Sequence, residues 1–204
     1  MMKANKEFRA LAAVVLAAGL SSRMKENKLL LPWKNSTVIG WVISQLMKAE
    51  LSRVFVVTGR DANLVESLTS IPGVKHIYNE CYADGEMLHS LQAGLKSLPD
   101  EVNAALVVLG DQPQIEIETI RLVAREFEDN PNSKLILPSC QNRRGHPWIV
   151  ARELWEEIIS MEPPDNLRNF LQRHSGEITY VLVNTTTIFA DIDTPQEYQE
   201  SQKH

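Results

Sequence analysis

Glycine is scarce in the first part of the chain, where many nucleotide-binding proteins concentrate it. Gly19 is the only glycine before Gly40, and none of the 9 glycines in the 204-residue sequence is followed by lysine. A dinucleotide-binding fingerprint needs three closely spaced glycines, and a P-loop needs a Gly-Lys-Ser or Gly-Lys-Thr step. The sequence therefore argues against a nicotinamide-dependent dehydrogenase and against a P-loop kinase.

Cysteine and an excess of positive charge are lacking as well. The chain has 2 cysteines, and its 21 Lys and Arg residues against 26 Asp and Glu residues give a net charge of −5. Two cysteines in a chain of this length do not form a disulfide framework. A mildly acidic protein also lacks the basic surface of a general nucleic-acid binder. We therefore expect free thiols and no nucleic-acid partner.

The apolar stretch near the N-terminus is too short to span a membrane. It covers residues 10–20 and follows Lys3, Lys6 and Arg9, a pattern that a signal peptide would share. Glu7 interrupts the basic region, and a membrane-spanning helix needs about 20 apolar residues. We interpret the stretch as the first core strand and expect a cytoplasmic protein with no membrane partner.

Short apolar runs alternate with amphipathic stretches along most of the chain. Short runs rich in apolar residues predict strands over residues 12–16, 54–58, 74–78, 104–109 and 135–137. Several of these runs are continuously apolar, which is typical of strands buried on both faces of a parallel sheet. Helical spacing of apolar residues predicts helices between them, over residues 38–46, 61–69, 87–98 and 117–127. In the last third we expect strands over 148–150 and 178–183, and helices over 154–159, over 166–174 and from Pro195. The alternation predicts one α/β domain over residues 1–204, a doubly wound, mostly parallel sheet with helices on both faces, with residues 1–11 as a loose extension.

The loop after the first strand is the first candidate site, because ligands of open α/β sheets bind at the carboxyl ends of the strands. The loop begins with Leu16, Ala17, Ala18 and Gly19. Small residues leave backbone N–H groups free to approach an anion, and Arg23 and Lys28 add a guanidinium and an ammonium nearby. This set suits a triphosphate. A small-residue strand end with two solvated cations explains the loop alone equally well.

Carboxylates supply the second and third candidate sites. Asp111 follows the apolar run over 104–109 directly after Gly110, where it is well placed to hold Mg²⁺ beside phosphates. Asp191 and Asp193 stand two residues apart near the C-terminus, on one face if the segment is extended. Taken alone, Asp111 is also an ordinary turn former, and Asp193 also fits a helix start.

Taken together and in order, these motifs resemble a known family. The sequence reads Leu-Ala-Ala-Gly-Leu-Ser-Ser-Arg-Met from Leu16, Gly-Asp-Gln-Pro from Gly110, Arg-Gly-His-Pro from Arg144 and Asp-Ile-Asp-Thr-Pro from Asp191. It resembles the nucleotidyltransferases of molybdenum cofactor maturation, most closely the molybdenum cofactor cytidylyltransferase branch. The resemblance extends over residues 13–198 and implies a Rossmann-like fold of the nucleotide-diphospho-sugar transferase type.

The resemblance implies a role for each motif. The catalytic residues would be Arg23, Lys28 and Asp111. Asp111 and Asp193 would bind the metal, with Asp193 preferred to Asp191. The nucleotide would bind to Leu16, Ala17, Ala18, Gly19, Arg23, Lys28, Asn79, Gly85 and Ser90. The acceptor would meet Arg144, Gly145 and His146. The Ala17-Ala18 pair is similar to the pair in family members that use cytosine nucleotides.

The implied activity is that of a Mg²⁺-dependent cytidylyltransferase of the EC 2.7.7 type. It would move CMP from CTP to the phosphate of molybdopterin or molybdenum cofactor and release pyrophosphate. A molybdoenzyme that receives the product is a further expected partner. Two alternatives stay open: the same transfer to a sugar or polyol phosphate, and a carrier protein that binds nucleotide or molybdenum cofactor without catalysing transfer.

Overall fold

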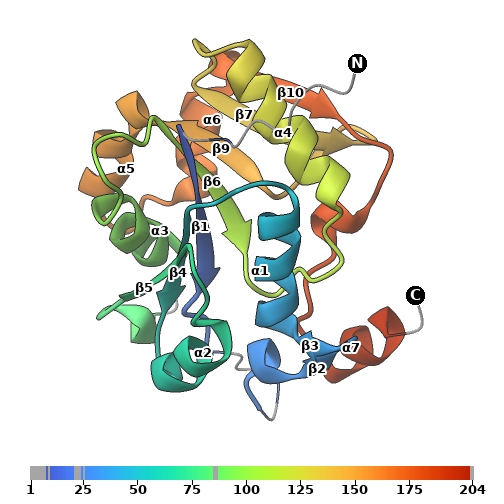
Figure 1. Ribbon diagram of the computed structural model, residues 1–204. Helices are drawn as coiled ribbons and strands as arrows, with labels where there is room; N and C mark the ends of the chain where they lie inside the picture. The colour runs from blue at the N-terminus through green and yellow to red at the C-terminus, as the bar shows by residue number, and fades with distance from the viewer. Residues whose placement is uncertain (1–7, 9, 21–23, 25, 85–86, 203–204) are drawn as a thin grey trace.

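A single eight-stranded sheet forms the centre of the computed structural model, which describes residues 8, 10–20, 24, 26–84 and 87–202 (Figure 1). The strand order is β10-β7-β9-β6-β1-β4-β5, and β8 pairs with β7 off this path. The strands are β1 (Leu11–Ala17), β4 (Val54–Thr58), β5 (Val74–Tyr78), β6 (Ala104–Leu109), β7 (Leu135–Cys140), β8 (Arg143–Arg144), β9 (Trp148–Ala151) and β10 (Ile178–Leu182). All neighbouring pairs on the path are parallel except those that β9 makes. The predicted mostly parallel sheet is confirmed.

The central strands are buried on both faces, as their uninterrupted apolar sequences predict. In β1, residues 11, 13, 15 and 17 belong to one core cluster, and residues 12 and 14 belong to the other. Because successive side chains of a strand point to opposite faces, one short run supplies both cores. The edge strands differ: Tyr180 and Leu182 of β10 are 49% and 81% exposed.

Helices cover both faces of the sheet (Figure 1). The first core cluster packs α1 (Val38–Lys48), α2 (Ala62–Thr69) and α4 (Ile117–Asp129) against one face. The second packs α3 (Met87–Lys96), α5 (Trp155–Ser160) and α6 (Leu167–Arg173) against the other. The doubly wound arrangement expected from the sequence is therefore present, and α7 (Pro195–Ser201) begins at the expected proline.

Short elements complete the fold. They are η1 (Lys28–Leu30), β2 (Pro32–Trp33), β3 (Ser36–Thr37), η2 (Tyr82–Asp84), η3 (Arg152–Leu154), η4 (Ser175–Glu177) and η5 (Thr187–Phe189). Strand β1 begins at Leu11, one residue before the expected start, and Phe8 is buried against the same core. Residues 1–7 and 9 of the expected extension lie outside the described residues. In the part of the chain that the structure describes, no helix is long and apolar enough to cross a membrane.

An ion network ties the last third of the chain to the sheet. His174 Nε2 lies 2.7 Å from Glu157 Oε2, and His174 Nδ1 lies 2.9 Å from Glu177 Oε1. Burial acts to lower the pKa of His174, but the hydrogen bonds to Glu177 and Glu157 outweigh it, so the pKa is raised. Glu177 also pairs with Lys134 at 2.8 Å. These contacts connect α5, η4 and the start of β7.

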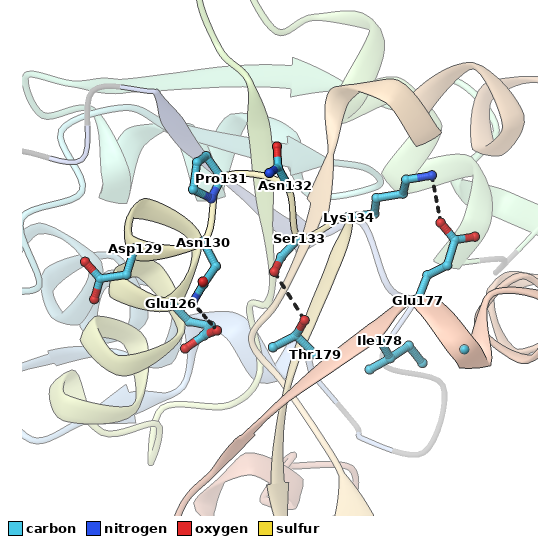
Figure 2. A pocket seen from close by; sticks show the side chains of 11 residues that line it. Glu126, Asp129, Asn130, Pro131, Asn132, Ser133, Lys134, Glu177, Ile178 and Thr179 are labelled. Atoms are coloured by element: carbon cyan, nitrogen blue, oxygen red, sulfur yellow. Dashed lines mark hydrogen bonds and ion pairs between the residues drawn. The ribbon is translucent and has the colours of Figure 1, made fainter.

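Figure 2 shows the hollow beside this network, with Lys134 pointing to Glu177 and Ser133 facing Thr179. It lies where β7 and β10 begin. Asp111 follows the end of β6, which runs in the same direction as β7 since both are antiparallel to β9. The hollow therefore lies at the amino ends of β7 and β10, whereas the candidate site lies at the carboxyl end of β6, on the opposite side of the sheet.

Candidate functional site

The candidate site lies at the carboxyl ends of the two central strands β1 and β6. Gly110 follows β6, and its N–H donates to the carbonyl of Leu16 at 3.0 Å. A Cβ at position 110 would lie 3.0 Å from that same oxygen, so glycine allows the two strand ends to approach closely. This contact places Asp111 directly beside the start of the first loop.

The C-terminal segment brings a second carboxylate to the same place. The N–H of Ile192 donates to the carbonyl of Asp111 at 3.1 Å, and Ile192 is 1% exposed in the core. Asp193 follows immediately, and its N–H donates to Glu197 Oε2 at 2.9 Å. Glu197 also forms a capping box with Thr194 at the start of α7. The helix start therefore fixes the backbone of Asp193 without using its carboxylate.

Lys28 joins the two carboxylates. Its Nζ lies 2.5 Å from Asp111 Oδ2 and 2.7 Å from Asp193 Oδ1, and its side chain is 12% exposed. Burial acts to lower the pKa of Lys28, but Asp111 and then Asp193 outweigh it, so the pKa is raised and the amine stays charged. The structure brings these three candidate side chains together, although Lys28 and Asp193 are 165 residues apart in the sequence.

Asp191 stands apart from this contact. Burial, followed by the negative charges of Asp111 and Asp193, raises the pKa of the Asp191 carboxyl. Of the two C-terminal aspartates, Asp193 is the one that shares a cation with Asp111.

The metal site that the motifs imply can be tested on this geometry. Among the described residues, no group of three or more His, Cys, Asp and Glu side chains is arranged to hold a metal ion by itself. Mg²⁺ in nucleotide-using enzymes is bound through one or two carboxylates, with substrate phosphates and water completing its shell. Asp111 and Asp193 fit this arrangement, since they already share one positive charge at 2.5 and 2.7 Å.

The structure describes the beginning of the predicted nucleotide loop, which includes Gly19. Ala17 and Ala18 are 6% and 5% exposed, whereas Gly19 is exposed, and a Cβ there would meet no atom of the described residues within 4 Å. Packing against the described residues therefore does not require a glycine at position 19. Leu16 is half-buried at the end of β1. Arg23 lies outside the described residues.

The segment predicted to line the base and ribose holds a buried polar pair. Asn79 and Ser90 are 3% and 7% exposed, and Asn79 Nδ2 donates to Ser90 Oγ at 3.1 Å. Asn79 Oδ1 accepts from the N–H of Cys81 at 3.0 Å. These bonds attach the start of α3 to the turn after β5, so both side chains shape the segment. Gly85 lies outside the described residues.

The predicted acceptor residues lie at the end of β8 and in the turn that leads to β9. Arg144 is exposed, and Gly145 packs so closely that a Cβ would lie 2.8 Å from Ile188 Cβ. The N–H of His146 donates to the carbonyl of Ile188 at 3.0 Å. Burial lowers the pKa of His146 to about 4, so its imidazole is neutral at pH 7. Gly145 and His146 therefore attach this turn to η5, which leads to the Asp193 segment.

Sequence reasoning missed the residues that hold Lys28 in place. Asn27 Oδ1 accepts from the N–H of Leu29 at 3.0 Å, which caps η1. Asn27 Nδ2 donates to Asp61 Oδ2 at 2.7 Å, just before α2. An asparagine before an apolar helical run is a recognisable start signal. The bond to Asp61 crosses 34 residues, and no local pattern points to it.

Comparison with known proteins shows the family of this chain. The sequence profile of the MobA-like NTP transferase domain family matches residues 13–178. The chain belongs to this family. The molybdenum cofactor cytidylyltransferase of Escherichia coli K12 is 30% identical over 190 residues, which cover 93% of this chain and 94% of that protein. The family membership expected from the motifs is therefore confirmed.

Several solved structures have the same fold as this chain. Rv0371c from Mycobacterium tuberculosis H37Rv superimposes with a TM-score of 0.80 at 24% identity, over 96% of this chain and 98% of that one. A structure of Rv0371c in complex with manganese superimposes with a TM-score of 0.76 at 23% identity, over 95% and 98% of the chains. A nucleotidyl transferase from Methanothermobacter gives 0.81 at 24% identity, over 96% and 97%. At these identities the likeness establishes the fold, which is the expected one.

Proposed function

We propose that the protein transfers CMP from CTP to the phosphate of molybdopterin or molybdenum cofactor and releases pyrophosphate. The observation that carries the proposal is the contact of the Lys28 ammonium with Asp111 and Asp193 at 2.5 and 2.7 Å. This contact lies at the carboxyl ends of the central strands, where open α/β folds bind nucleotides. The choice of CTP and of the acceptor is supported by the similarity to the Escherichia coli cytidylyltransferase and by the Ala17-Ala18 pair.

The proposed reaction is an in-line displacement at phosphorus. An oxygen of the acceptor's phosphate forms a bond to the α-phosphorus of CTP, and the bond from that phosphorus to the bridging oxygen of the β-phosphate breaks. Pyrophosphate leaves with the electron pair. Because the attacking phosphate is already an anion at neutral pH, no strong general base is needed. Positioning and charge neutralisation then supply the catalysis.

Different residues of the site would bind the phosphates, the leaving pyrophosphate and the divalent cation. The backbone N–H groups that follow β1, with Gly19 exposed among them, would receive phosphate oxygens. Lys28 and Arg23 would hold the charge of the leaving pyrophosphate. Asp111 and Asp193 would hold a divalent cation, which supplies charge neutralisation at the phosphates when bound. The manganese complex of the similarly folded Rv0371c is consistent with such a cation.

The first test is thermal unfolding of the purified protein with CTP, GTP, ATP or UTP, with and without Mg²⁺. A nucleotide at about 100 times its dissociation constant adds about 2.7 kcal/mol to the free energy of unfolding. We expect an increase in Tm that is selective for CTP and dependent on Mg²⁺. A GTP-selective increase would contradict the choice of base, and no increase with any nucleotide would favour a carrier protein.

The second test is pyrophosphate release from CTP and the pterin acceptor, with matched aspartate variants. Asp111→Asn should lower turnover about 100-fold or more, as removal of a group that organises charge in the transition state does. Asp100→Asn is the control, since Asp100 is fully exposed and precedes β6 at the opposite sheet edge. Full activity of Asp111→Asn would contradict the assignment of the site.

A further inference from the structure

The Lys28 ammonium occupies the point that the two carboxylates of the site share. Nζ lies 2.5 Å from Asp111 Oδ2 and 2.7 Å from Asp193 Oδ1. These are distances of charge-assisted hydrogen bonds. The three side chains are 12%, 19% and 25% exposed, so water screens the contact only in part. The protein therefore provides its own cation for this position.

The proposed function, on which this inference rests, needs the same groups in a different pairing. The carboxylates would bind a divalent cation, and the ammonium would bind the triphosphate. Mg²⁺ approaches carboxylate oxygens to about 2.0–2.1 Å, so it cannot share the point between the two oxygens with Nζ. Two positive charges a few ångströms apart in a half-buried site also repel each other strongly. Lys28 and the metal therefore compete for one position.

The backbone of Lys28 is held in place while its side chain can rotate. Asn27 caps the η1 turn at Leu29 and bonds to Asp61 at 2.7 Å. Leu29 is 3% exposed in the core. The ammonium itself ends a flexible four-carbon stem. The bonds that hold the backbone of Lys28 therefore do not depend on the partner of its ammonium.

We propose that Lys28 is the resident counter-ion of the metal site, which the bound triphosphate draws away from Asp111 and Asp193 so that a divalent cation can take its place. Without nucleotide, the metal has to break the ion pairs of Lys28 with Asp111 and Asp193, so it binds weakly. With nucleotide, the phosphates receive the ammonium. Metal and nucleotide therefore strengthen each other's binding, and this coupling is reciprocal.

The test measures binding of Mn²⁺ alone to nucleotide-free protein, through the loss of the electron paramagnetic resonance signal of free Mn²⁺. Lys28→Met removes the competing charge and should bind Mn²⁺ about tenfold more tightly than the wild type, within the usual range of such couplings. Lys28→Gln, which is also neutral but still donates hydrogen bonds, should show the same gain if the methionine variant proves unstable. Lys28→Arg keeps the charge and should bind as weakly as the wild type.

A matched surface variant and a second readout complete the test. Lys96→Met makes the same chemical change at the exposed end of α3 and should leave Mn²⁺ binding unchanged. Mn²⁺ should also raise the Tm of Lys28→Met more than that of the wild type. Equal or weaker Mn²⁺ binding by both neutral variants overturns the proposal, and so does an equal gain in Lys28→Arg. In either case, pyrophosphate release from CTP by the wild type would still uphold the proposed function.

Discussion

Gly145 offers the sharpest test of how the fold builds the site, because its role follows from packing alone. In Gly145→Ala, the new Cβ would lie 2.8 Å from both Cβ and Cγ1 of Ile188, and closer still to the Ile188 carbonyl oxygen. Contacts below 3.0 Å are essentially never seen for a Cβ atom. Since the nearest atom belongs to the backbone, no change of rotamer relieves the clash. The η5 turn has to move.

The energetic cost can be built from the contacts that this movement disturbs. Overpacking in a core typically costs about 1–3 kcal/mol. The hydrogen bond from the His146 N–H to Ile188, at 3.0 Å, is lost as well, at about 1 kcal/mol. A total of about 2–4 kcal/mol lowers the Tm of a chain of this length by about 5–15 °C. Because Asp193 lies five residues after Ile188, pyrophosphate release should fall too.

Calorimetry of the wild type, Gly145→Ala and Gly176→Ala checks this reasoning. Gly176 lies in η4, and a Cβ there would meet no atom within 4 Å. Its alanine variant should stay within about 0.5 kcal/mol of the wild type. A Gly145→Ala protein that unfolds at the wild-type temperature would refute the packing argument, and the motif glycine would then need a role in ligand binding alone.

Three further predictions follow from burial, charge and open space. The stability that protonated His174 contributes should be complete below pH 6.5, the ordinary pKa of a histidine side chain, and should be lost as the pH rises through the raised pKa of His174; urea unfolding from pH 6 to 9 should show this loss in the wild type and not in His174→Gln. Ile120→Ala, at a side chain 0% exposed, should lower the free energy of unfolding by about 2–5 kcal/mol. Leu64→Ala, at 54% exposure, should change it by about 0.5 kcal/mol or less, and equal losses in urea titrations would contradict the core assignment. Gly19→Ala should unfold like the wild type, since its Cβ meets no atom of the described residues within 4 Å, yet should lose the stabilisation by CTP; an unchanged response to CTP would show that this loop does not bind the nucleotide.

Much of the fold could be predicted from local pattern. The expected bounds of β4, β5 and β6 agree with the structure at both ends, and β7 runs three residues longer than expected. Strands buried on both faces have continuous apolar sequences, which are hard to confuse with the half-exposed faces of the helices. The last third is less regular because its helices are short and β10, at one edge of the sheet, is only half-buried.

The antiparallel direction of β9 could not be predicted in this way. Trp148, Ile149 and Val150 are apolar and buried, as they would be in a parallel strand. Apolar side chains indicate that a strand is buried. They do not indicate which strands lie beside it or in which direction those strands run.

The α/β class, the order of the strands and helices along the chain, and the residue types at the candidate site could be predicted from the amino-acid sequence. The contact of Lys28 with both Asp111 and Asp193, and the need for Gly145 beside the backbone of Ile188, became visible in the folded chain. The physical reason is the range of the interactions. Periodicity and capping act over a few residues, whereas the Lys28–Asp193 contact joins residues 165 apart, and its partner is chosen by how the whole sheet packs.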